Sequence, residues 1–166
     1  MQEVEMVNEK VERFSKEGQE NERFTSMINW ASRMMSLTLK EKQIRQFQAP
    51  KRGEIWTVDL GENVGSEENK IRPCLIIQDD ETNRVATTTV ILPITKRQPR
   101  FFSHVRIKPE DTMDENCSID GSIMTEQIRV VSKARLGKQP IGSVSQSVLD
   151  KLDWTMNQAL GLKTGG

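Results

Sequence analysis

Histidine and cysteine are scarce in this chain: its 166 residues include one histidine, His104, and two cysteines, Cys74 and Cys117. The cysteines form no CxxC motif and no cluster with the histidine, which argues against a zinc site, and no metal ligand is predicted. A single histidine also excludes a mechanism that needs two histidines of one subunit. Cys74 lies in an apolar stretch and is predicted to be a core residue, whereas Cys117 lies in a polar stretch and is predicted to be in a loop.

Long apolar runs are also missing, and none approaches the length of a transmembrane helix. The first residues, Met-Gln-Glu-Val-Glu-Met, are too acidic and polar for a secretory signal. We therefore expect a cytoplasmic protein without a membrane partner.

A net charge is absent as well, because 24 Lys and Arg residues balance 24 Asp and Glu residues. Global charge thus gives no argument for nucleic acid or membrane binding. Acidic residues are, however, missing from the whole segment 82–109. The same segment holds the cations Arg84, Lys96, Arg97, Arg100, Arg106 and Lys108, together with His104. Such a segment fits a face that binds a polyanion, and accidental sorting on a mixed-charge surface explains it equally well.

Residues 1–48 contain no proline and one glycine, Gly18, and are rich in residues that favour helix. Their apolar residues recur at helical spacing in two sets, Val4, Val7, Val11, Phe14 and then Phe24, Met27, Ile28, Ala31, Met34, Met35. We predict a helical N-terminal extension, as two helices or one broken helix. Neither apolar stripe is wide enough to fold alone, so the extension must pack on its own domain, a second copy or another protein. A partly solvated helix without chemical function is the simpler alternative.

From residue 51 onward the pattern changes to short strands. They are predicted over residues 53–60, 71–78, 85–92, 104–108 and, as one or two strands, 121–131, with a polar loop over 61–70. Their close spacing without intervening helices predicts a mainly β (α+β) fold, a small antiparallel barrel. A helix is predicted after Ser143, which forms a capping box with Gln146 unless Ser145 is the cap, and it should close one end of the barrel.

Two segments suggest a site that holds phosphate. In the first, a polar loop ends at Arg72, directly before a buried apolar run. In the second, Thr95 stands in a similar position at the end of Leu92-Pro-Ile-Thr. Arginine offers a rigid fork of N–H donors and stays charged, and the threonine adds a hydroxyl donor. The simpler readings are a surface ion pair of Arg72 with Glu67 or Glu68, and a β-branched residue that merely ends a strand.

Several ordered pieces of the chain resemble MazF/PemK-type toxins. They are Lys51-Arg-Gly-Glu-Ile-Trp-Thr-Val-Asp-Leu60, Val64-Gly-Ser-Glu67, Ile71-Arg-Pro-Cys-Leu-Ile-Ile-Gln-Asp-Asp80, Asn83-Arg84, Ile94-Thr95, Ser103-His-Val105, Ser122-Ile-Met-Thr-Glu-Gln-Ile-Arg129 and Lys133-Ala-Arg-Leu136. The resemblance covers residues 51–160 and excludes the extension. It implies an SH3-like barrel domain over residues 51–162 that ends in a C-terminal helix, is related to CcdB and forms homodimers. It also implies the toxin of a type II toxin–antitoxin system, which cleaves single-stranded RNA at specific sequences without a metal or other cofactor and is inhibited by a cognate antitoxin.

The resemblance assigns roles to individual residues. The family pattern places its catalytic arginine and threonine at Arg72 and Thr95. The implied RNA-binding residues are Ser66, Glu67, Gln78, Lys96, Arg97, Arg100 and Gln127, of which Gln78 and Gln127 rest on the resemblance alone. The loop departs from the family at Glu67-Glu-Asn-Lys70, where many relatives have a glycine pair, and this should stiffen it.

Three further questions stay open at this stage. The general base is unassigned: Glu67 is either a proton acceptor, a base reader or a solvated loop residue, and His104 fits a structural or phosphate-contacting role better than a catalytic one. Phe101 and Phe102 either stack on RNA bases or are buried. Two other functions compete with the nuclease: a CcdB-like toxin that binds and poisons a protein target, and an inactive RNA-binding module.

Overall fold

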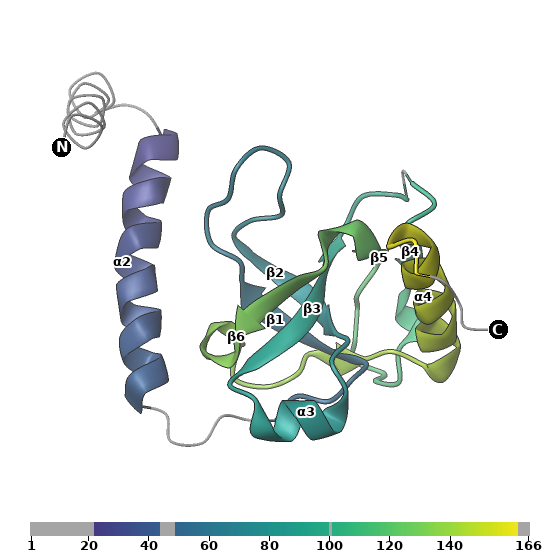
Figure 1. Ribbon diagram of the computed structural model, residues 1–166. Coiled ribbons are helices and arrows are strands. Elements are labelled where there is room, and N and C mark those ends of the chain that lie inside the picture. Colours follow the sequence, from purple (N-terminus) through teal and green to yellow (C-terminus); the bar gives the residue numbers. More distant parts are fainter. Residues whose placement is uncertain (1–21, 44–48, 100, 163–166) are drawn as a thin grey trace.

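The computed structural model describes residues 22–43, 49–99 and 101–162 (Figure 1). The first predicted apolar stripe, Val4 to Phe14, and the predicted RNA-binding residue Arg100 lie outside these ranges. Among the described helices, none is long and apolar enough to cross a membrane.

Seven antiparallel strands form a curled sheet that makes a half-barrel. They are β1 (Glu54–Asp59), β2 (Ile71–Ile76), β3 (Thr88–Thr95), β4 (His104–Ile107), β5 (Gly121–Met124), β6 (Arg129–Ser132) and β7 (Gly142–Ser143). The order across the sheet is β4-β5-β3-β2-β1-β7, and β6 pairs with β3 outside this path. The predicted antiparallel, mainly β fold is confirmed.

Strand β3 is central to the sheet because it pairs with three other strands, β6 and β5 on one edge and β2 on the other. Residues Thr88–Ile91 face β6, Ile91–Pro93 face β2, and Ile94 and Thr95 face β5. A long strand that changes neighbours along its length curls the sheet around a core. The pairing of β3 with β2 ends at Pro93, whereas the pairing with β5, on the other edge of β3, includes Ile94 and Thr95.

The helices include one that the sequence analysis missed. They are α2 (Glu22–Gln43), α3 (Asp80–Val85), α4 (Gln146–Ala159) and the single 3₁₀ turns η1 (Pro109–Asp111), η2 (Thr125–Gln127) and η3 (Lys133–Arg135). Helix α3 takes residues 80–85, so the third strand begins at Thr88 rather than at the predicted Val85. Asp79 caps α3, since its carboxylate accepts from the Thr82 N–H at 2.9 Å.

The start of α4 also differs from the prediction. Its N-cap is Ser145, without a side-chain hydrogen bond. Ser143 lies in β7 and donates to Asp114 Oδ2 at 3.0 Å, and Gln146 donates forward to Asp150 at 2.8 Å. The predicted Ser143–Gln146 capping box is therefore wrong, because the chain is still extended at Ser143.

Two apolar clusters fill the two faces of the sheet. The first lies under α4 and includes Ile55, Leu75, Leu92, Ile94, Val105, Ile107, Ile123, Val148 and Leu152. The second lies under β6 and η3 and comprises Trp56, Val58, Leu60, Cys74, Ile76, Ile91, Val131 and Leu136. The alternation within β1 divides its residues between the clusters, and α4 closes the first one. Cys74 is confirmed as a core residue, and Cys117, although in a loop, is buried too.

Helix α2, the described part of the extension, packs on the barrel on the opposite side from α4 (Figure 1). The Trp30 ring of α2 lies directly on Gly61, where an added Cβ would come within 2.2 Å of the ring. Arg135 of η3 stacks on the same ring at 4.9 Å from its centroid. Polar contacts lie on either side of Trp30, because Ser26 donates to Glu62 at 2.6 Å and Lys40 donates to the Ala134 carbonyl at 3.1 Å.

The outer face of α2 stays exposed. Its apolar side chains there include Ile28, Met35 and Leu39. Helix α2 is thus held by one aromatic residue and a few polar contacts rather than by a continuous apolar face.

Candidate active site

Arg72 and Thr95 lie at the same end of two neighbouring strands. The pairing of β2 with β3 aligns Leu75 with Leu92 and Cys74 with Pro93. Continuing that register by two residues brings Arg72 opposite Thr95. Directly opposed residues of an antiparallel pair project from the same face of the sheet, here the face of the second apolar cluster.

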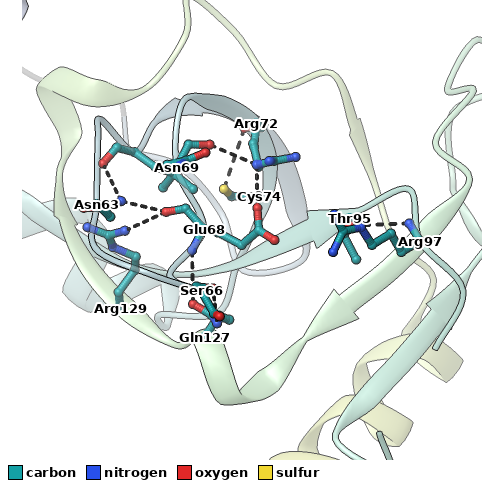
Figure 2. Close-up of polar contacts among 11 residues, drawn as sticks. Asn63, Ser66, Glu68, Asn69, Arg72, Cys74, Thr95, Arg97, Gln127 and Arg129 are labelled. Carbon is teal, nitrogen blue, oxygen red and sulfur yellow. Dashed lines mark hydrogen bonds and ion pairs between the residues drawn. The ribbon is translucent and has the colours of Figure 1, made fainter. Parts of the chain in front are cut away.

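The hydrogen-bonded pairing of β2 with β3 ends two residues before this position, and we call this break in the pairing the gap. The pairing of β2 with β3 ends at Cys74 and Pro93, whereas β1 still pairs with β2 at Arg72 and β5 pairs with β3 at Thr95. Figure 2 shows the two side chains on the two sides of this gap. The Arg72 side chain is 35% exposed, while Thr95 is 6% exposed, so the arginine reaches solvent and the threonine lies at the edge of the core.

The loop before Arg72 is folded back on itself. Leu60 and Lys70 form its base, with Leu60 N–H donating to the Lys70 carbonyl at 2.9 Å. The Asn63 amide donates to the Glu68 carbonyl at 2.7 Å and so ties the loop across its middle. Lys70 has a φ of +64°, in the left-handed region that favours glycine. The loop therefore makes a glycine-like turn with a lysine, within the segment Glu67–Lys70 where the resemblance implies a glycine pair.

Glu68 is the carboxylate that this loop turns toward Arg72. Its Oε2 lies 2.5 Å from Arg72 Nε, and the Glu68 side chain is 18% exposed. The single N–H at Nε donates to the Asn69 carbonyl at 2.9 Å, so the Glu68 contact is a close ion pair and Oε2 itself accepts no hydrogen bond. The predicted ion pair of Arg72 thus exists, and Glu68 rather than Glu67 makes it.

The other edge of the Arg72 guanidinium is open. Within the described part of the chain, neither Nη atom has a hydrogen-bond or ion-pair partner. Two parallel N–H groups on one side of a guanidinium match two oxygens of a phosphate. The site therefore presents a vacant donor edge beside a fixed carboxylate.

Residues from the far side of the site support the loop. Gln127, at the end of η2, accepts from the Glu68 N–H and donates to the Ser66 carbonyl, both at 3.4 Å. Arg129 of β6 approaches the Glu68 carbonyl at 3.5 Å. Of the predicted RNA-binding residues, Ser66 and Gln127 are thus brought together with Arg72, and Glu67 lies exposed on the same loop. Sequence reasoning missed Arg129, whose nearest signal was its place in the segment Ser122–Arg129.

A cationic and aromatic segment follows Thr95. Lys96 and Arg97 are exposed, and the Arg97 N–H donates to Thr95 Oγ1 at 3.4 Å. Phe101 and Phe102 are 62% and 76% exposed, so of the two alternatives the structure favours availability for stacking over burial.

Gln78 lies elsewhere. It follows the opposite end of β2, six residues or about 20 Å along the strand from Arg72. Its amide donates to Asn83 Oδ1 at 2.9 Å and to the Thr88 carbonyl at 3.2 Å. The structure does not bring Gln78 to the other predicted site residues.

His104 also lies apart from Arg72 and Thr95. Its Nε2 is 2.8 Å from Glu126 Oε1, and Ser103 donates to the other oxygen of the same carboxylate at 2.8 Å. It stands on β4, which β5 separates from β3. The structural reading of His104 fits this arrangement.

Neither a thiol nucleophile nor a protein metal cluster is found near the gap. Burial raises the pKa of the Cys74 thiol to about 12, which keeps it protonated at neutral pH. Among the residues that the structure describes, no three His, Cys, Asp or Glu side chains are grouped as a metal site would need. The functional groups next to the gap are thus the Arg72 guanidinium, the Thr95 hydroxyl and the Glu68 carboxylate.

The fold is that of a known class of toxins. Residues 51–160 match the family described as PemK-like, MazF-like toxin of type II toxin–antitoxin system. The chain belongs to this family. The match begins after α2, so the extension lies outside it.

Relatives and solved structures agree with this membership. The chain is 34% identical over 114 residues to Endoribonuclease EndoA of Bacillus subtilis, covering 68% of this chain and 95% of the relative. It is 33% identical over 115 residues to Endoribonuclease MazF of Staphylococcus epidermidis, covering 68% and 92%. Among structures, it is similar to a mycobacterial endoribonuclease in complex with its cognate antitoxin, with a TM-score of 0.57, 25% identity and coverage of 70% and 100%. MazF of Deinococcus radiodurans shares the fold, with a TM-score of 0.57, 17% identity and coverage of 69% and 99%.

Proposed function

We propose that this protein is an endoribonuclease toxin that cleaves single-stranded RNA without a metal. The observation that carries the proposal is the placement of Arg72 and Thr95 at the same end of two neighbouring strands, beyond the point where the strands pair, next to the exposed cations Lys96 and Arg97. Relatives at 33% and 34% identity that bear the name endoribonuclease support it.

The proposed reaction uses the RNA as its own nucleophile. The 2′-hydroxyl attacks the neighbouring phosphorus, the bond to the 5′-oxygen breaks, and one product ends in a 2′,3′-cyclic phosphate. The intermediate phosphorane carries more negative charge than the phosphodiester. Fixed donors that point to this charge lower the barrier, and removing one such donor typically costs about 10²–10³-fold in rate.

Arg72 and Thr95 are the proposed donors. The Nη edge of Arg72, which has no partner within the described residues, would bind two phosphate oxygens, while the Thr95 hydroxyl would donate from the neighbouring strand. Arginine is a poor proton donor at neutral pH, so its proposed role is charge stabilisation and not protonation of the leaving oxygen. 

RNA on either side of the cut would lie along the loop and the segment after β3. The proposed contacts are Ser66, Glu67, Lys96, Arg97, Arg100 and Gln127. Phe101 and Phe102 would stack on bases, a contact that contributes about 1–3 kcal/mol per base. The RNA contact of Gln78 implied by the resemblance stays a prediction and is not part of this proposed path.

The proposed partners follow from the family. We propose a cognate antitoxin, in line with the mycobacterial and Deinococcus complexes of similar fold, a homodimeric toxin and a cytoplasmic location. We further propose that residues 51–162 form the catalytic domain and that residues 1–48 form an appendage to it.

Incubation of the purified protein with mixed single-stranded RNA in EDTA tests the proposal. We expect discrete fragments that end in 2′,3′-cyclic phosphate. RNA that is bound tightly but left intact would instead indicate an RNA-binding module, and RNA neither bound nor cut would favour a toxin with a protein target.

A further inference from the structure

The proposed reaction leaves one proton without an acceptor, since the 2′-hydroxyl must lose its hydrogen as it attacks. A general base must lie within hydrogen-bond reach of that hydroxyl, next to the phosphate. Among the described residues, the acidic side chain in contact with Arg72 is Glu68. Glu67 lies exposed, and Glu126 is bonded to Ser103 and His104 on another strand.

The two edges of the Arg72 guanidinium have different partners: the Nε edge contacts protein groups, and the Nη edge is the proposed phosphate-binding edge. Its Nε edge holds Glu68 at 2.5 Å and the Asn69 carbonyl at 2.9 Å. Its Nη edge stays open for a phosphate. A bound phosphate and the Glu68 carboxylate would thus be neighbours on one cation, which offsets their mutual repulsion. In the view of Figure 2 the carboxylate lies between Arg72 and Thr95.

Oε2 of Glu68 is buried, and its contact with Arg72 Nε at 2.5 Å is an ion pair without hydrogen-bond geometry. Oε2 has no hydrogen-bond partner, whereas buried polar atoms in native proteins nearly always have one. Within the described residues, no hydrogen bond engages the Glu68 carboxylate, so it is not committed to another donor and can accept a proton. 

Contacts to its backbone hold residue Glu68 in place. Asn63 donates to the Glu68 carbonyl at 2.7 Å, Arg129 approaches the same oxygen at 3.5 Å, and the Glu68 N–H reaches Gln127 at 3.4 Å. Contacts from both the loop and the far side of the site fix the residue, so its position does not depend on the ion pair alone.

We propose that Glu68 is the general base of the reaction, an inference that rests on the proposed nuclease function. The 2′-O–H bond breaks and its proton passes to the Glu68 carboxylate while the 2′-oxygen bonds to phosphorus. The bond from phosphorus to the 5′-oxygen breaks, and the departing oxygen takes a proton from solvent. Glu68 then returns its proton to solvent, so no group is consumed.

The test compares Glu68→Gln with the matched change Glu81→Gln. Glu81 also pairs with an arginine, Arg84, at 3.4 Å, but on the exposed helix α3 away from the gap. Glutamine keeps the size of the side chain and removes its basicity. We expect kcat of Glu68→Gln to fall about 10²–10⁴-fold, the usual contribution of a general base, while Glu81→Gln keeps the wild-type rate. Binding of an RNA with 2′-deoxyribose at the cut position should stay within a few-fold of wild type.

A rescue experiment separates a base from a structural role. In Glu68→Ala, added formate should restore part of the lost kcat, because a small carboxylate can enter the vacated space and accept the proton. Arg72→Ala should show no such rescue. Melting temperatures of all variants report whether each is folded.

The outcomes distinguish this inference from the function on which it rests. If wild type cuts RNA and Glu68→Gln cuts equally fast or faster, Glu68 is only a counter-ion that competes with phosphate, and the inference is overturned while the nuclease stands. Loss of activity without formate rescue, together with a lowered melting temperature, would also overturn it in favour of a structural role. If wild type leaves RNA intact, the nuclease proposal itself fails.

Discussion

Two polar clusters lie on this one sheet, and they differ in how completely their atoms are bonded. At the first, Asn83 is fully buried, its Oδ1 accepts from Gln78 and Thr89 at 2.9 Å each, and its Nδ2 donates to the Gln78 carbonyl at 3.0 Å. The buried ammonium of Lys133 donates to the carbonyls of Asn83 and Ala86. At the second, Glu68 Oε2 and both Nη atoms of Arg72 have no hydrogen bond within the described residues.

We infer that the fully bonded polar groups around Asn83 stabilise the fold, whereas the partly unbonded groups of Glu68 and Arg72 are available to bind a ligand. A closed network of buried hydrogen bonds fixes a unique structure, and losing one member leaves the others unpaired. An open network at the edge of a gap contributes little to stability and is free to bind. We therefore expect mutations at Asn83 to lower stability and mutations at Arg72 to lower activity.

The largest expected effect is on catalysis at the open cluster. Arg72→Ala removes the guanidinium and should lower the rate of RNA cleavage about 10³-fold, because a preorganised donor to the phosphorane is lost. Single-turnover cleavage of a fixed RNA measures it. The control is Arg33→Ala, which removes an arginine paired with Asp59 at 3.0 Å on α2 and should cut normally. Wild-type cutting by Arg72→Ala would remove Arg72 from its proposed role.

The closed cluster should respond in stability instead. Asn83→Ala leaves the Gln78 amide, the Gln78 carbonyl and the Thr89 hydroxyl without their Asn83 partner in the interior, and we expect a loss of about 3 kcal/mol in the free energy of unfolding. Urea denaturation followed by circular dichroism measures this. The cleavage rate per folded molecule should stay unchanged, and a selective loss of activity would break the comparison.

Thr95→Val tests the hydroxyl on the opposite side of the gap. Valine keeps the shape of the side chain, so the loss of one donor should lower the cleavage rate about 10²-fold with little change in melting temperature. Thr89→Val is the matched change in the closed cluster, where the hydroxyl donates to Asn83. That variant should lose stability and keep its activity, and the reverse pattern would contradict the account.

Gln78→Ala sharpens the comparison at a residue with two competing interpretations. The resemblance implies an RNA contact, whereas the structure commits the Gln78 amide to Asn83 and the Thr88 carbonyl. We expect a loss of about 1–2 kcal/mol in unfolding free energy and unchanged RNA affinity. A weaker affinity for uncleavable RNA at full stability would restore the RNA-binding role.

The smallest effect is expected where α2 meets the barrel. Trp30→Ala removes the ring that covers Gly61 and stacks on Arg135, and the barrel core does not depend on it. We expect a loss of about 1 kcal/mol, within the range of ordinary single substitutions, and near-normal cleavage. A loss of activity larger than that of Thr95→Val would show that α2 controls the loop that begins at Gly61.

Local sequence predicted the parts of the molecule that local chemistry decides. The alternation of residues 53–60 correctly predicted strand β1. The positions of Arg72 and Thr95 beside buried runs correctly indicated that both lie at strand ends. Helix α3 was missed because Val85 to Leu92 reads as one β-branched run. The acceptor Asp79, followed by acidic residues in the first turn, was the signal that could have found it.

The rest depends on tertiary contacts. From the sequence, Glu67 and Glu68 were equally good candidates for an ion pair with Arg72. Glu68 makes the ion pair because of the left-handed turn at Lys70 and the hydrogen bond from Asn63 to the Glu68 carbonyl. The docking of α2 depends on the contact of Trp30 with Gly61. The hydrophobic periodicity of the helix cannot predict this contact, because it does not identify the partner residue. The resemblance alone assigned Gln78 to the site. Its hydrogen bond to Asn83 could not be predicted, because Asn83 lies in helix α3, which was itself not predicted.

The central claim is that Arg72 and Thr95 stabilise a phosphorane formed by the 2′-hydroxyl of the RNA itself. The most direct measurement uses a short RNA whose cut position has been mapped, made once as all-ribose and once with a single 2′-deoxynucleotide at that position. We predict that the first is cut to a 2′,3′-cyclic phosphate and that the second is bound equally well and left intact. Cleavage of the second at the same bond would contradict the account.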